Sequence, residues 1–305
     1  MYDVVIVGSG PAGLSASVYA KRAGLNAATF EVTPVSGGQI LSTYEVDNYL
    51  GLPGISGMEL GSKFREHADK LGCKFVVGKV TKINKLEDGF VLNTENGDVS
   101  TRCVVLATGA TPAVLGVPGE EDLFGMGVSY CATCDGAFFK NKTVAVVGGG
   151  DVAVEDAIYL SRTCQKVYLI HRRDQLRATK ILQEDLLSGD NVEVLWNTVV
   201  ETINGEDQVE AATVKDTVFG NKRDIAIDGI FIAVGMNPVN ELAKGLVNLD
   251  EKGFIMSGDQ CITNVPGVFV AGDLRTKKLR QVVTAVADGA NVITSVEAYL
   301  RKIKK

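Results

Sequence analysis

The sequence has few cysteines, no long apolar stretch and no excess of basic residues. Six cysteines among 305 residues are too sparse for a disulfide-stapled scaffold. No apolar run approaches the roughly 18 residues of a membrane-spanning helix, and no basic segment precedes an apolar one at the N-terminus as in a signal peptide. Acidic residues outnumber basic ones by 37 to 31, which argues against nucleic acid or an anionic membrane as a partner. We therefore expect a cytoplasmic protein that binds neither.

Histidine is scarce as well, with His67 and His171 as its two examples. A structural zinc site needs four ligands, and the chain contains a single C-x-x-C, Cys131 with Cys134. This shortage disfavours zinc and predicts no metal site. It also leaves no spare histidine for Cys-His or Ser-His-Asp catalysis, because His67 fits a helix face and His171 adjoins two arginines.

Glycine, in contrast, is abundant, and many glycines fall in a repeated pattern. There are 34, about 11% of the chain against a usual level of about 7%. Each repeat has an apolar strand, a glycine-rich turn, a helix, a second strand and later a hairpin-like region. The strands begin at Asp3 and Thr143, and the second strands end at Glu31 and His171. We expect two βαβ nucleotide-binding units, the second inserted into the first.

The first repeat carries the turn Gly8-Ser-Gly-Pro-Ala-Gly13 between strand and helix. Glycines there let the backbone approach a pyrophosphate, which the N-terminus of the following helix attracts. Glu31 lies 23 residues after Gly8 and predicts hydrogen bonds to ribose hydroxyls. A tight strand-helix turn without a ligand is the alternative. The predicted nucleotide contacts are Gly8, Gly10, Pro11, Ala12, Gly13 and Glu31.

The second repeat differs at the position that selects the nucleotide. Its turn is Gly148-Gly-Gly150-Asp151-Val-Ala153, and His171 takes the place of Glu31, followed by Arg172, Arg173 and Arg177. Adjacent arginines can hold a 2′-phosphate that an acidic residue would repel. The pattern predicts NADPH, with Gly148, Gly150, Asp151, Ala153, His171 and the three arginines as its contacts. A solvated basic loop is the alternative.

The cysteine pair precedes the second repeat, in Cys131-Ala-Thr-Cys134-Asp135-Gly136. Cysteines at this spacing can close and reopen a small disulfide ring, and Asp135 could move a proton to or from a thiolate. An inert thiol pair stays possible.

Near the C-terminus, Gly272-Asp273 ends a predicted strand. Asp273 could hold a polyol chain, or it could simply cap a turn.

Together these motifs resemble the low-molecular-weight, bacterial-type thioredoxin reductases along nearly the whole chain. Further motifs carry the resemblance: Ser36-Gly37-Gly38-Gln39, Glu45-Val-Asp47-Asn48 to Gly54, Ala107-Thr108-Gly109, Ala271-Gly272-Asp273 and Arg280-Gln281. The resemblance implies an α/β fold of two Rossmann-like, three-layer domains. Residues 1–115 and 245–305 would bind FAD, and residues 116–244 would bind NADPH and carry the cysteine pair.

The resemblance also implies roles for individual residues. Cys134 would be the sulfur nearer the flavin, Cys131 would attack the disulfide of thioredoxin or a similar protein, and Asp135 would be the acid. The FAD contacts would also include Gly37, Gly38, Gln39, Asn48, Thr108, Gly109, Gly272, Asp273, Arg280, Gln281 and Val282. A homodimer with domains that rotate against each other is implied too. The alternatives are a related flavin reductase or oxidase that uses ferredoxin, oxygen or a small dithiol, and a flavin-bound redox sensor.

Overall fold

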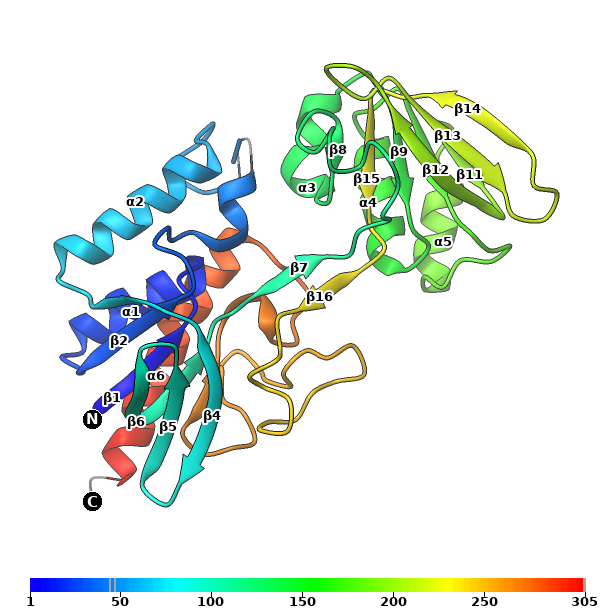
Figure 1. The fold of residues 1–305 in the computed structure, drawn as a ribbon. Helices are drawn as coiled ribbons and strands as arrows, with labels where there is room; N and C mark the ends of the chain where they lie inside the picture. Colours follow the sequence, from blue (N-terminus) through cyan, green and yellow to red (C-terminus); the bar gives the residue numbers. More distant parts are fainter. Residues whose placement is uncertain (44, 47, 304–305) are drawn as a thin grey trace. The chain divides into compact units, whose positions relative to one another are not determined.

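The computed structural model describes residues 1–43, 45–46 and 48–303, which form two compact units (Figure 1). The first consists of Met1–Thr111 and Asn237–Lys305, and the second of Pro112–Met236. The sequence predicts these divisions at 115/116 and 244/245. The second division comes earlier because Leu242 and Ala243 pack into the core of the first unit.

The first unit contains a seven-stranded sheet in the order β3-β2-β1-β6-β5-β4, with β17 also paired to β6. Strands β1, β2, β3, β6 and β17 pair in parallel, whereas β4, β5 and β6 form an antiparallel meander. Their bounds are β1 Tyr2–Val7, β2 Ala27–Glu31, β3 Phe75–Val77, β4 Val80–Leu86, β5 Gly89–Thr94, β6 Gly97–Leu106 and β17 Val268–Val270.

Both faces of this sheet are buried, which explains the unbroken apolar run of β1. Val4 and Ile6 pack in the cluster that α1 and α6 cover, and Val5 and Val7 pack in the cluster on the opposite face. Figure 1 shows α1 and α6 lying along one side of the unit. The helices are α1 Pro11–Arg22, η1 Gly38–Ser42, α2 Gly57–Lys70, η3 Gly272–Leu274 and α6 Val282–Ile303.

The second unit repeats the plan with a five-stranded parallel sheet in the order β11-β10-β9-β15-β8. A three-stranded antiparallel sheet, β12-β13-β14, packs against one face of it, and α4 packs against the other. The elements are β8 Val128–Ser129, α3 Ala132–Asp135, η2 Gly136–Phe139, β9 Thr143–Val147, α4 Asp151–Ser161, β10 Lys166–Ile170, α5 Lys180–Leu187, β11 Val192–Leu195, β12 Thr198–Asn204, β13 Ala211–Asp216, β14 Lys222–Ala226 and β15 Gly229–Ile232.

The two crossings of the chain pair with each other. Strands β7 (Ala110–Pro112) and β16 (Met236–Pro238) form a two-stranded sheet, seen side by side in Figure 1. The predicted α/β class with two βαβ units is confirmed. Helix α2 begins at Gly57, because the side chain of Ser56 caps it by accepting a hydrogen bond from Glu59 N.

Candidate functional site

The first glycine-rich turn lies between β1 and α1, as predicted. α1 starts at Pro11 with Gly10 as its N-cap. A Cβ on Gly13 would lie 1.9 Å from the carbonyl oxygen of Gly8, so only glycine lets the helix pack this closely on the turn. Ala12 and Gly13 are buried, while Gly8, Gly10 and Pro11 are partly exposed. The N-terminal end of α1 therefore lies beside a partly exposed glycine turn, an arrangement that suits an anion.

Glu31 ends β2 and turns its carboxylate back onto this loop. Its Oε2 accepts hydrogen bonds from Ser9 N at 2.7 Å and from Ser9 Oγ at 2.8 Å, and its Oε1 accepts one from Val32 N at 2.8 Å. These bonds hold the carboxylate in one position beside the turn. An acceptor fixed there suits a ribose hydroxyl, which can donate to the remaining lone pair on Oε1.

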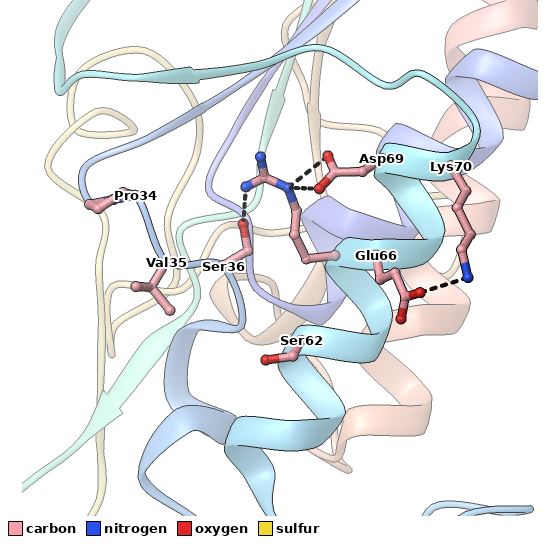
Figure 2. Close-up of a pocket in the computed structure, with 8 residues that line it drawn as sticks. Pro34, Val35, Ser36, Ser62, Glu66, Asp69 and Lys70 are labelled. Carbon is pink, nitrogen blue, oxygen red and sulfur yellow. Dashed lines mark hydrogen bonds and ion pairs between the residues drawn. The ribbon is translucent and has the colours of Figure 1, made fainter.

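A hollow of about 620 Å³, which the sequence analysis did not find, lies between the loop after β2 and helix α2 (Figure 2). Arg65 crosses it, donating to Ser36 Oγ at 2.9 Å and to both oxygens of Asp69, with its guanidinium over the ring of Phe75. Ser36 Oγ also lies 2.9 Å from Ser9 Oγ, within hydrogen-bond distance, which links this cluster to the turn that holds Glu31. The sequence of α2 does not predict this hollow, because oppositely charged residues four positions apart are equally typical of a helix surface exposed to solvent. The lining residues are Pro34, Val35, Ser36, Ser62, Arg65, Glu66, Asp69 and Lys70.

Residues far apart in the sequence meet around the remaining predicted flavin contacts. Asn48 Nδ2 donates to Gln281 Oε1 at 2.9 Å across 233 positions, just before α6 begins at Val282. Gly37 and Gly38 approach Gly10, since a Cβ on Gly10 would lie 3.9 Å from both the Gly37 oxygen and Gly38 Cα.

Three more predicted positions complete this region. Gln39 is exposed within η1. Thr108 Oγ1 donates to Val239 O, and a Cβ on Gly109 would meet nothing within 4 Å. Asp47 of the Glu45–Gly54 motif lies outside the described residues.

Asp273 provides the test of whether FAD fits this unit. Its Oδ1 is buried and has no hydrogen-bond partner among the described residues, and the nearest cation, Lys277 Nζ, is 3.7 Å away. Burial raises the pKa of this carboxyl, and Lys277 and Arg280 oppose the rise. A Cβ on Gly272 would lie 2.9 Å from Cβ of Ala12, so Asp273 follows directly on a close contact with α1. A polyol hydroxyl would satisfy Oδ1, and the site fits FAD.

Arg280, predicted as a cofactor contact, organises its own loop in the structure. Its guanidinium donates to the carbonyl oxygens of Asp273, Arg275 and Lys277 at 3.2–3.4 Å. It also stacks over the ring of Phe254, 4.2 Å from the centroid. The side chain therefore braces the segment that leads from Asp273 to α6.

In the second unit, the glycine-rich turn leads into α4, for which Gly150 is the N-cap. Ala153 is fully buried, and Gly148 and Gly150 are partly exposed. The exposed Asp151 accepts a hydrogen bond from Thr179 N at 2.8 Å and so connects the starts of α4 and α5. The predicted phosphate-binding arginines, Arg172, Arg173 and Arg177, are all exposed beyond the end of β10.

His171 is buried, whereas the arginines that follow it are exposed. It is only 4% exposed, and its Nε2 lies 3.0 Å from the carbonyl oxygen of Gln175. Burial lowers its pKa, and nearby Arg177 and Arg173 lower it further. The histidine is therefore a neutral interior side chain at neutral pH, whereas the arginines reach solvent.

Cys131 and Cys134 form a disulfide at the start of α3, with their Cα atoms 5.3 Å apart. Both cysteines are partly exposed. Asp135 accepts a 2.5 Å hydrogen bond from Ser129 Oγ, and the same hydroxyl accepts one from Cys131 N at 3.0 Å. Burial raises the pKa of Asp135, partly offset by the Ser129 bond. A carboxyl with a raised pKa beside a disulfide can supply a proton to a thiolate that leaves it.

Glu120 and Tyr130 also belong to this region, although no sequence signal singled them out. Glu120 is 4% exposed and accepts hydrogen bonds from Leu115 N, Gly116 N and the Tyr130 hydroxyl at 2.6–2.9 Å. Tyr130 directly precedes Cys131. The carboxylate therefore anchors the redox segment to the loop that follows β7.

Within residues 1–43, 45–46 and 48–303, no helix is both long enough and apolar enough to cross a membrane. In that same part of the chain, His, Cys, Asp and Glu side chains do not gather into a group that could hold a metal ion.

Comparison with known proteins gives consistent matches. Residues 2–289 match the family model of the pyridine nucleotide-disulphide oxidoreductases. The thioredoxin reductase of Bacillus subtilis is 43% identical over 306 aligned positions, covering 100% of this chain and 96% of the relative. That of Peptoclostridium acidaminophilum is 44% identical, covering 98% and 97%.

Solved structures agree with the sequence comparison. The crystal structure of thioredoxin reductase from Streptococcus pyogenes is 46% identical with a TM-score of 0.92, covering 99% of both chains. The thioredoxin reductase structure from Giardia duodenalis is 33% identical with a TM-score of 0.92, covering 98% and 99%. This chain therefore belongs to the pyridine nucleotide-disulphide oxidoreductase family.

Proposed function

We propose that this protein is an NADPH-dependent thioredoxin-disulfide reductase. The observation that carries the proposal is the Cys131–Cys134 disulfide, which lies in a nucleotide-binding unit with three exposed arginines just after β10, in a chain whose other unit fits FAD. FAD, when bound, supplies a two-electron relay between the nicotinamide and the disulfide. The named relatives support thioredoxin as the partner.

The first unit would hold FAD. Backbone amides at the start of α1 would face the pyrophosphate, and Glu31 would accept from the ribose. Asp273 Oδ1, which lacks a hydrogen-bond partner among the described residues, would accept from the ribityl chain. Asn48 and Gln281, joined by their side-chain hydrogen bond, would line the ring.

The second unit would hold NADPH. The turn from Gly148 to Gly150 would face its pyrophosphate, and the exposed Arg172, Arg173 and Arg177 would surround the 2′-phosphate. Charge-assisted bonds from guanidinium groups favour this ligand over NADH, which has a hydroxyl at the same position.

The cysteine pair would transfer the electrons by thiol–disulfide exchange. Two electrons and two protons convert the Cys131–Cys134 disulfide into a dithiol. The Cys131 thiolate attacks one sulfur of the partner disulfide, forms a mixed disulfide and releases a partner thiolate. The Cys134 thiolate then attacks Cys131, which restores the internal disulfide and releases the second partner thiolate, and Asp135 is the proton donor and acceptor beside the pair. Overall, NADPH and one proton reduce one partner disulfide to two thiols.

The test is NADPH oxidation by the purified FAD-containing protein, with and without oxidised thioredoxin from the same organism. We expect oxidation that depends on thioredoxin and disappears in Cys134→Ser. NADPH oxidation that proceeds equally without any disulfide would instead indicate an oxidase, and a flavin that NADPH does not bleach would overturn the nucleotide assignment. The homodimer and the cytoplasmic location stay predictions from the sequence.

A further inference from the structure

The second unit contains two loops that would have to act together on one dinucleotide. One is the glycine loop, residues 148–150, after β9. The other is the arginine loop, residues 171–177, after β10, which carries the exposed Arg172, Arg173 and Arg177. A ligand with both a pyrophosphate and a 2′-phosphate is bound well only if the spacing between these loops is correct.

The His171 ring lies directly between the two loops. A Cβ built on Gly149 would be 2.2 Å from both Cε1 and Nδ1 of the ring, so the imidazole packs against the bare backbone of the glycine loop. Its Nε2 lies 3.0 Å from the carbonyl oxygen of Gln175, in the arginine loop. One side chain therefore contacts both loops.

Backbone hydrogen bonds complete the arrangement. Arg177 N donates to Gly149 O at 2.7 Å, which joins the loops directly. Asn197 N donates to Arg173 O at 3.1 Å, and Thr198 N donates to His171 O at 2.9 Å, which tie the arginine loop to the segment after β11. The arginine backbone is thus held from two sides, with the imidazole at the centre.

We propose that His171 is a positioning residue that sets the distance between the glycine loop and the phosphate-binding arginines, and that it does not contact the 2′-phosphate. This inference rests on the proposed NADPH dependence. It replaces the role that the sequence analysis assigned to His171, because a side chain that is 4% exposed and aimed at a backbone carbonyl has no free donor directed to solvent. The lowered pKa agrees, since a neutral ring adds no charge for a phosphate.

The molecule contains its own reporter for this region. Trp196 is the only tryptophan in the chain, is 37% exposed and packs edge-on against His171, with ring centroids 6.4 Å apart. Its emission reports on the arginine loop without any need for turnover. NADP⁺ and NAD⁺ affinities of the FAD-containing protein can therefore be titrated by Trp196 fluorescence and checked by calorimetry.

The variants are His171→Ala and His171→Gln, since a glutamine Nε2 can reach the same carbonyl without being able to carry a charge. We expect His171→Ala to lower the ratio of NADP⁺ to NAD⁺ affinity about tenfold, the loss typical of one buried hydrogen bond, and His171→Gln to keep it within about threefold. His67→Ala, an exposed histidine on α2, is the matched control and should leave the ratio unchanged.

Each other outcome contradicts the inference in a recognisable way. If His171→Ala and His171→Gln lower the ratio of NADP⁺ to NAD⁺ affinity equally, the imidazole itself contacts the phosphate. Parallel losses of NADP⁺ and NAD⁺ affinity would mean that His171 only stabilises the unit. If the wild type does not prefer NADP⁺ over NAD⁺, the proposed function fails at its NADPH assignment instead.

A second pair of variants remains informative even if His171→Ala folds poorly. Gly149→Ala places a methyl group where the ring lies, so we expect it to lower the NADP⁺ to NAD⁺ ratio in the wild-type background. In the His171→Gln background the glutamine side chain can bend away from the added methyl group. We therefore expect Gly149→Ala to lower the ratio of NADP⁺ to NAD⁺ affinity less in that background. An identical effect of Gly149→Ala in both backgrounds would show no coupling between the two positions and would overturn the inference.

Discussion

The carboxylate of Asp288 receives two hydrogen bonds from the guanidinium of Arg275, from Nε at 2.9 Å and from Nη2 at 2.8 Å. The two side chains are only 4% and 7% exposed. The same carboxylate accepts from Lys277 Nζ at 2.9 Å and from Gly272 N at 3.0 Å. Asp288 on α6 thus fixes the loop that carries Asp273, the candidate ribityl ligand.

Asp288→Asn should therefore be strongly destabilising. It removes one carboxylate and leaves two buried cations without their main partner, which typically costs about 3–5 kcal/mol in the free energy of unfolding. Urea denaturation measures the change. The control is Glu297→Gln, which breaks an exposed i,i+4 pair with Arg301 and should cost less than about 1 kcal/mol. Similar losses in both variants would contradict the importance of the buried cluster.

Asp156 on α4 should make the folded protein less stable as pH rises, whereas a carboxylate in an ion pair makes it more stable. Burial, with a contribution from Glu155, raises its pKa from 3.8 to about 7. Between these values the folded protein binds the proton that the unfolded chain has lost, so stability falls as pH rises. We expect urea midpoints to drop between about pH 4 and about pH 7 in the wild type and to drop less in Asp156→Asn. The same drop in both proteins would exclude Asp156 as the cause.

Asp135 should control the proton transfer at the disulfide. Asp135→Asn is expected to slow thioredoxin-dependent NADPH oxidation about a hundredfold while NADP⁺ affinity stays unchanged. Ser129→Ala removes the hydrogen bond that lowers the pKa of Asp135, so the protonated form should persist and the alkaline limb of kcat should move to higher pH. Steady-state rates across pH provide the measurement, and an unmoved alkaline limb would argue against Asp135 as the titrating group.

The arginine pair should decide between NADPH and NADH. Replacing both Arg172 and Arg173 with Ala removes two charge-assisted contacts to the 2′-phosphate, for which we expect about a hundredfold weaker NADPH binding and nearly unchanged NADH binding. Arg162→Ala, an exposed arginine at the end of α4, is the matched control. If the double variant weakens NADPH and NADH binding equally, Arg172 and Arg173 do not bind the 2′-phosphate.

Much of this molecule was readable from local patterns. The strand-turn-helix repeats, the terminal Glu31 and the arginines after β10 depend on spacing within about 25 residues, and the two βαβ units form where those spacings predict. The C-x-x-C also closes as a disulfide, because cysteines three positions apart in a short helix are held close by the local backbone.

What local patterns did not reveal depends on which distant segments meet. Asn48 bonds to Gln281, Asp288 gathers donors from the loop before α6, and Glu120 holds Tyr130, although none of these residues belongs to a motif that predicts its partner. His171 shows the difference most clearly. The sequence by itself determined that it follows β10 beside two arginines, but only the tertiary structure decided that its ring turns inward onto Gly149, because burial and packing depend on neighbours that sequence spacing does not specify.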